Sequence, residues 1–176
     1  MDFERIAKVS RQRCERWHPN GLDDWSLEEW GNAFFGEAGE LANVLKKIHR
    51  VQTHVHAIRD AGIEELRVQA GEELGDTYLY MDLACQAAGV EIKEIVVEHD
   101  AFYRESTSAQ IGNRLGMVAG RFCECMAQGG LGVQKAMCDV YGVLQGIADH
   151  LSVDIERCVV STFNRVSARE GFPERL

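Results

Sequence analysis

Apolar residues recur at intervals of three and four positions along most of the chain, which is the spacing of one face of an α-helix. Alternating apolar and polar runs are nearly absent, and the β-branched runs at 95–97 and 159–160 are too short to support a sheet. The two prolines, Pro19 and Pro173, leave everything between them free to be helical. We therefore expect an all-α protein.

The apolar periodicity predicts where the helices lie. Ser26 and Glu29 form the signature of a capping box, so a helix should begin at Leu27. Residues 51–62 show little periodicity and are predicted to be a loop or a short, poorly packed helical insert. Helices are expected over residues 2–17, 27–50, 64–88, 91–104, 110–128, 133–151 and 153–169.

Composition limits the class of protein. The chain has 176 residues, of which 45% are hydrophobic, so it is globular and forms one domain or two very small ones. A net charge of −9 without a basic stripe argues against a nucleic-acid partner. With no signal peptide and no apolar run of membrane-spanning length, we expect a cytoplasmic protein that does not contact a membrane. In a reducing compartment the six cysteines should be free thiols.

Two short segments each place two carboxylates three residues apart: Glu37 with Glu40, and Glu73 with Asp76. On a helix this spacing puts both carboxylates on one face, one turn apart, where they repel each other. A divalent cation between two such helices would turn the repulsion into attraction. Four converging carboxylates suit a hard ion that prefers oxygen ligands, such as Mg²⁺ or Mn²⁺. The alternative is a solvated acidic face.

Two observations favour convergence of the acids over a solvated face. Gly39 and Gly75 lie inside the acidic segments, and Gly in a helix interior costs about 1 kcal/mol relative to Ala, so both positions suggest that another helix approaches closely. Glu73 and Asp76 also flank the apolar side of their predicted helix. Carboxylates beside a buried stripe are either paired or bound to metal.

The second half of the chain repeats part of the first. Asp76-x-Tyr78 recurs 63 residues later as Asp139-x-Tyr141, and similar apolar and acidic residues follow in both places. The alignment of the two halves replaces three acids: Glu37 by Val118, Glu40 by Arg121 and Glu73 by Ala136. The second copy therefore could not hold the metal.

We expect one compact domain made of two units. Residues 1–106 form a helical unit with the intact acidic motif, and residues 107–176 form a degenerate repeat that packs on it. The fold would then be a helical bundle built as a tandem pseudo-repeat.

These segments resemble the MazG-like members of the all-α nucleoside triphosphate pyrophosphohydrolases. The family motif is Glu-x-x-Glu, a linker and Glu-x-x-Asp, which the four acids meet with a linker that is longer than usual. Residues 25–30 (Trp-Ser-Leu-Glu-Glu-Trp), 36–47 and the C-terminal tail 163–176 resemble the small phage-type members closely. In those relatives the tail follows the acidic helices directly, whereas here it ends the second unit.

The resemblance implies a helical MazG-like bundle that hydrolyses a dNTP to the dNMP and pyrophosphate and so controls the deoxynucleotide pool. It favours a purine dNTP such as dGTP or dATP, Mg²⁺ (or Mn²⁺) as cofactor, and a homo-oligomer, either a dimer or a tetramer. The implied metal ligands are Glu37, Glu40, Glu73 and Asp76. We assign the general base to Glu37, although the sequence does not separate it from Glu40.

Further side chains are candidates for binding the substrate. An aromatic slot for the base and cationic contacts to the phosphates are what a nucleoside triphosphate requires. Trp30 and Phe34 could equally be core residues, and the lysines could serve only the helix dipole. The predicted substrate-binding residues are Trp25, Trp30, Asn43, Lys46, Lys47, Asn164 and Arg165, the last two completing the pocket from the second unit.

Two other functions are open to this sequence. A di-iron carboxylate bundle would require two Glu-x-x-His pairs on inward faces, and the chain has one, Glu15 with His18. A non-catalytic helical module that binds nucleotide or mediates dimerisation would account for the degenerate second unit.

Overall fold

The computed structural model describes residues 1–54, 62–92 and 102–176, and within these ranges the chain is all-α without a β-strand, as predicted. No helix in these ranges combines the length and the apolar character needed to cross a bilayer. The elements are α1 (Phe3–Trp17), the 3₁₀ helix η1 (Gly21–Asp24), α2 (Leu27–Gln52), α3 (Ile63–Ala87), α4 (Phe102–Glu105), α5 (Ser108–Ala127), α6 (Val133–Leu151) and α7 (Ile155–Arg169).

The six long helices begin and end within two residues of their predicted limits. The capping box that predicts the start of α2 is present, because the Ser26 backbone N–H donates to Glu29 Oε2 at 2.7 Å while Ser26 Oγ accepts from the Glu29 N–H at 3.3 Å. The predicted helix at 91–104 falls mostly on residues 93–101, which lie outside the described residues, as does most of the predicted insert at 51–62.

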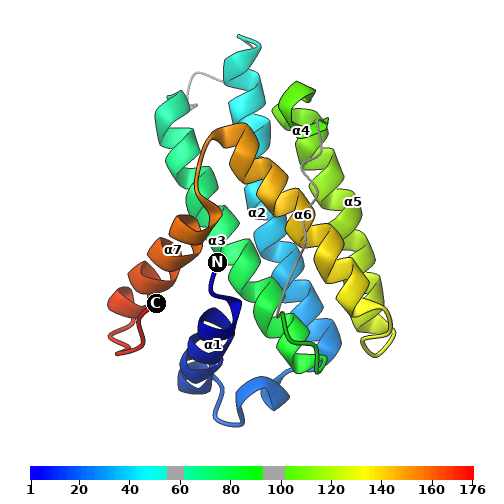
Figure 1. The fold of residues 1–176 in the computed structure, drawn as a ribbon, viewed down its shortest axis with the longest axis vertical. Helices are drawn as coiled ribbons and strands as arrows, with labels where there is room; N and C mark the ends of the chain where they lie inside the picture. The colour runs from blue at the N-terminus through cyan, green and yellow to red at the C-terminus, as the bar shows by residue number, and fades with distance from the viewer. Residues whose placement is uncertain (55–61, 93–101) are drawn as a thin grey trace.

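Four helices, α2, α3, α5 and α6, pack side by side as a bundle (Figure 1). Helices α2 and α5 run antiparallel. A Cβ on Gly31, near the start of α2, would lie 3.1 Å from Met126 Cβ near the end of α5. At the other end of the pair, a Cβ on Gly112 would lie 3.9 Å from Leu45 Cβ. The glycines on the facing sides of α2 and α5 therefore let the two predicted units pack closely.

One hydrophobic core runs through both predicted units. Phe34 of α2 and Phe122 of α5 pack with their ring centroids 4.7 Å apart. Tyr78 of α3 and Tyr141 of α6, which the sequence repeat matches, meet edge to face at 6.1 Å. Residues from the two predicted units thus share a single interior. The repeat itself stays a prediction.

Helices α1 and α7 pack on α3 outside the four-helix bundle (Figure 1). At the contact between α3 and α7, a Cβ on Gly75 would lie 2.6 Å from Thr162 Oγ1 and 2.8 Å from the Cys158 carbonyl oxygen. The predicted close approach is confirmed at Gly75. It is wrong at Gly39, where no other described helix comes within 4 Å of the position a Cβ would take, because this residue lies on an exposed part of α2.

All six cysteines are free thiols, as predicted. Burial raises the pKa of the Cys14 thiol to about 11, and it raises that of Cys85 further still. Thiols held in their neutral form inside the core act as packing groups rather than nucleophiles.

Candidate functional site

Three of the four predicted acids converge where α2 faces α3. Glu37 of α2 and Glu73 and Asp76 of α3 each offer a carboxylate oxygen, and these oxygens all lie within 4.8 Å of one another. All three side chains are partly buried. The spacing of three residues places Glu73 and Asp76 on the same face of α3, and the packing of α2 against that face brings in Glu37.

Glu40 does not belong to this group. It is exposed on α2, one turn beyond Glu37, and the carboxylates that converge are the other three. The negative charge of Glu40 nevertheless contributes to raising the pKa of both Glu37 and Glu73. Glu40 is therefore an electrostatic neighbour of the group rather than a member.

The electrostatics of the group follow from partial burial and mutual repulsion. Burial, with added repulsion from Asp76 and Glu40, raises the pKa of Glu37 to about 7. Burial and the charge of Glu40 raise the pKa of Glu73 to about 6. Holding all three carboxylates ionised at neutral pH is therefore unfavourable for the protein alone, and a cation placed among them would relieve the cost.

Arg165 of α7 approaches the acids from the second predicted unit. Its Nε lies 3.6 Å from Glu72 Oε1, and its Nη2 lies 3.7 Å from Asp76 Oδ2. Burial raises the pKa of Asp76, and the positive charge of Arg165 opposes that rise. The expectation that Arg165 from the tail reaches the acidic site agrees with this position.

A cavity of about 520 Å³ opens beside the acids, between α1, α2, α3 and α7. Pockets of this size hold small molecules. Glu37 and Asp76 form part of its wall together with three arginines, Arg13, Arg165 and Arg169. The rest of the lining is mostly aromatic and apolar: Cys14, Trp17, His18, Trp25, Trp30, Leu79, Tyr80, Leu83 and Val166.

The aromatic wall is a cluster of His18, Trp25 and Trp30. The ring centroids of Trp25 and Trp30 lie 4.7 Å apart, and His18 stands edge-on to Trp25 at the same distance. The Trp30 indole N–H donates to the Leu22 carbonyl at 2.9 Å, which fixes the ring. Trp30 is only 1% exposed, so it belongs to the core and also backs the cavity, whereas Phe34 belongs to the core alone.

Four predicted substrate-binding residues lie away from this cavity. Asn43 and Lys46 are exposed further along α2, and Lys47 follows them. The Asn164 side chain donates to the Leu176 carbonyl at 3.1 Å and accepts from the Leu176 N–H at 2.9 Å. Asn164 thus fastens the end of the chain to α7. The structure does not bring these four residues to the cavity, and their contacts with a substrate stay predictions.

Arg13 and Tyr80 line the cavity, although neither is among the predicted site residues. Tyr80 carries a raised pKa because it is largely buried and close to Glu37 and Asp76. The signal for Arg13 was present, since it continues the apolar stripe of α1 from Ile6 through Val9, where a charged residue is out of place.

The second unit has no equivalent acidic group. Val118 and Ala136, which the repeat aligns with Glu37 and Glu73, are buried in the core. Asp139 forms a surface ion pair with Lys135, whose Nζ lies 3.1 Å from Asp139 Oδ2. Within the described ranges, the three acids of the first unit are the one group with the ligand arrangement of a metal site.

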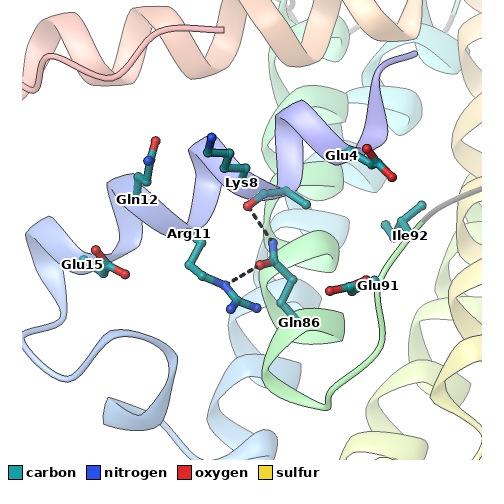
Figure 2. A pocket seen from close by; sticks show the side chains of 9 residues that line it. Glu4, Lys8, Arg11, Gln12, Glu15, Gln86, Glu91 and Ile92 are labelled. Carbon is teal, nitrogen blue, oxygen red and sulfur yellow. Dashed lines mark hydrogen bonds between the residues drawn. The ribbon is translucent and has the colours of Figure 1, made fainter.

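A second cavity of about 450 Å³ lies between α1 and the end of α3 (Figure 2). The Arg11 Nε–H donates to Gln86 Oε1 at 2.9 Å, and Gln86 Nε2 donates to the Ala7 carbonyl at 3.2 Å. Behind this cavity, Gln86 also donates to Asp82 Oδ2 at 2.8 Å. Burial raises the pKa of Asp82 to about 7. Arg11, Gln86 and Ala7 of the second cavity bond to one another, and the described acids that line this cavity do not converge as those of the first do.

Comparison of the chain with protein-family models, with curated proteins and with solved structures found no match in any of the three. The function of this protein is therefore inferred from the residues of the site themselves.

Proposed function

We propose that this protein is a metal-dependent nucleoside triphosphate pyrophosphohydrolase, a MazG-like helical bundle that converts a dNTP and water into the dNMP and pyrophosphate. The observation that supports it best is the convergence of Glu37, Glu73 and Asp76 beside a cavity with an aromatic wall. A nucleotide needs both parts, a charged end for its phosphates and an apolar slot for its base.

The three converging acids fit a divalent metal ion. Their donors are all carboxylate oxygens, the set that Mg²⁺ and Mn²⁺ prefer. Glu37, Glu73 and Asp76 would hold the ion, and Glu40 would add negative charge from the exposed side. When bound, the ion would neutralise charge that develops on the phosphate oxygens during phosphoryl transfer.

The guanidinium groups of the cavity would bind the triphosphate. Arg165 is 43% exposed, and its distances of 3.6 and 3.7 Å to Glu72 and Asp76 are longer than hydrogen bonds. It is therefore free to exchange these carboxylates for phosphate oxygens, to which guanidinium groups bind in a bidentate manner. Arg169, one turn further along α7, lines the same cavity.

Glu37 would accept the proton of the attacking water. A carboxylate oxygen of Glu37 that the ion does not bind would be available for this proton transfer. The water oxygen forms a bond to the α-phosphorus as the bond from that phosphorus to its bridging oxygen breaks, and pyrophosphate leaves. The nucleotide base would pack against Trp25 and His18 of the aromatic wall.

The two other functions account less well for these residues. A di-iron centre would need Glu15 and His18 to face one site, but Glu15 lines the cavity of Figure 2 whereas His18 lines the aromatic cavity. A non-catalytic nucleotide-binding or dimerisation module would not require the desolvated acids beside the aromatic wall. The predicted homo-oligomer and cytoplasmic location stay predictions.

The test is hydrolysis of single dNTPs in the presence of Mg²⁺, with products separated by anion-exchange chromatography. We expect dNMP and pyrophosphate, and at least roughly a 100-fold loss of kcat in Glu37→Gln and Asp76→Asn. Asp139→Asn is the matched control, because the repeat aligns it with Asp76 but it lies in a surface ion pair. Release of inorganic phosphate with a dNDP, or no product from any dNTP, would refute the proposal.

A further inference from the structure

Arg13 is a charged side chain in an unusual place. It is 5% exposed, on the face of α1 that packs against α7. Its Nη1 donates to the Phe163 carbonyl at 2.9 Å, and its Cζ lies 3.7 Å from the centre of the Phe163 ring. The ring of Trp17 lies near the same guanidinium, at 5.2 Å. The plane of the guanidinium is thus held by aromatic packing and one hydrogen bond.

The charge of Arg13 is balanced only by carboxylates at a distance: burial lowers the pKa of its guanidinium to about 10, and the charges of Asp76 and Glu174 only partly oppose this. Within the described ranges no carboxylate lies within 4.0 Å of it, and the Phe163 carbonyl is its one hydrogen-bond acceptor. Arg13 is also one of the residues that line the cavity, so a ligand bound there would meet it. A buried charge without a partner is costly. The cost is offset when a ligand in the cavity supplies acceptors.

The ligand group that best matches Arg13 is the edge of a base. Arg165 and Arg169 already supply the cavity with exposed guanidinium groups that can follow the phosphates. Arg13 differs from them because it is buried and fixed in orientation, and a fixed planar fork of donors selects two acceptors at a set spacing. Guanine offers such a pair in O6 and N7, whereas adenine has a donor at N6 in place of O6.

We propose that Arg13 reads the O6 and N7 edge of guanine, so that the substrate is dGTP. This inference rests on the proposed function, since it places the base in the same cavity as the acids. Adenine would leave one buried donor of Arg13 facing another donor, which discriminates more strongly than a missing apolar contact.

The first test compares kcat/KM for dGTP and dATP in the wild type and three variants. We expect the wild type to prefer dGTP by roughly 10- to 100-fold. Arg13→Gln and Arg13→Lys should both lose most of this preference, because neither offers the fork. Arg11→Gln should keep it, because Arg11 lies on the same helix but contacts Gln86 outside the cavity. An equal loss for both nucleotides, or an unchanged preference, would overturn the proposal.

The second test uses the wild type alone, so it holds even if the Arg13 variants fold poorly. The nucleotide 7-deaza-dGTP lacks N7, and the 2,6-diaminopurine dNTP carries an amine in place of O6. Each should be cleaved with a kcat/KM roughly 10-fold or more below that of dGTP. dITP keeps both acceptors and lacks only the 2-amino group, so it should match dGTP within a few-fold. Equal turnover of all four nucleotides would contradict the role of Arg13.

A third measurement separates failure of this inference from failure of the proposed function. If the wild type cleaves no dNTP, the proposed function fails, and binding of dGMP and dAMP to the metal-free protein then decides on Arg13. Quenching of the tryptophans in the cavity wall reports this binding. At least a 10-fold tighter binding of dGMP, abolished in Arg13→Gln, would support the proposal. Equal binding of the two nucleotides would refute it.

Discussion

Gly75 of α3 and Thr162 of α7 are in contact so close that a Cβ on Gly75 would lie 2.6 Å from the threonine hydroxyl oxygen. That hydroxyl also donates to the Glu72 carbonyl at 3.2 Å. Asp76 follows Gly75 directly, and Arg165 lies one turn beyond Thr162. The distance between an acid of the site and its guanidinium neighbour therefore depends on the absence of one side chain.

Gly75→Ala should destabilise the protein by about 1–3 kcal/mol, because overpacking outweighs the gain of about 1 kcal/mol in helix propensity. Gly39→Ala is the matched control, since it lies on α2 with open space around it and should gain up to about 1 kcal/mol. Urea denaturation of the three proteins measures both changes. A Gly75→Ala variant as stable as the wild type would show that the two helices separate without cost.

Binding of Mg²⁺ or Mn²⁺ should release protons. The pKa values of Glu37 and Glu73 are raised to about 7 and about 6, so at pH 6 both groups are partly protonated, and a cation binds only their ionised forms. The release should be larger at pH 6 than at pH 8, where both are already ionised. Calorimetric titration in buffers of different ionisation enthalpy measures it. Glu37→Gln should reduce the release, and a release that does not vary with pH would contradict this assignment.

Asp82 should make the protein less stable as the pH rises. Its pKa is raised from 3.8 to about 7 by burial, so the folded state holds a proton that the unfolded state has lost. The resulting penalty grows between about pH 4 and pH 7 and is complete above that. Asp82→Asn removes the charge, and its Oδ1 can still accept from Gln86.

We expect Asp82→Asn to exceed the wild type in stability by about 2–4 kcal/mol at pH 8 and by less at pH 5. Urea denaturation at the two pH values gives the comparison. Asp139→Asn, on the surface of α6, should show little dependence of this kind. If the free energy of unfolding changed with pH equally in Asp82→Asn and the wild type, Asp82 would not be the source of the pH dependence.

Two tryptophans of the aromatic wall should respond differently to truncation. Trp30→Ala should cost about 3–5 kcal/mol of stability, because the ring is fully buried and bonded to Leu22. Trp25→Ala should leave the fold largely intact and raise KM for the dNTP roughly 10-fold, because the partly exposed ring faces the cavity. Thermal melting of both variants measures the packing role of each ring, and steady-state kinetics measures its role in binding the dNTP. An unchanged KM in Trp25→Ala would show that Trp25 does not contact the base.

The fold was predictable from the sequence because long helices leave a periodic apolar pattern and caps mark their starts. The acids were predictable in part. A spacing of three residues places Glu40 on the same face of α2 as Glu37, but it does not say which turn of α3 lies opposite, and Glu40 is exposed. Adjacent residues 164 and 165 point about 100° apart on α7, so the sequence did not show that only Arg165 turns toward the acids.

Arg13 was not predicted because its partners come from the far end of the chain. The Phe163 carbonyl that it contacts lies 150 residues away, and no local pattern announces that pairing. A charged residue on an apolar stripe could have been noticed, but the stripe alone does not distinguish a structural arginine from one that faces a cavity.

The reach of Arg165 into the acidic group of the first unit also bears on how the site is assembled. Acids and guanidinium belong to one polypeptide, so their encounter is intramolecular and does not depend on protein concentration. A site formed by residues from two chains is lost when dilution separates the chains, and a defective partner chain can inactivate it. In this chain, each molecule carries both the acids and their cationic neighbour from the moment it folds.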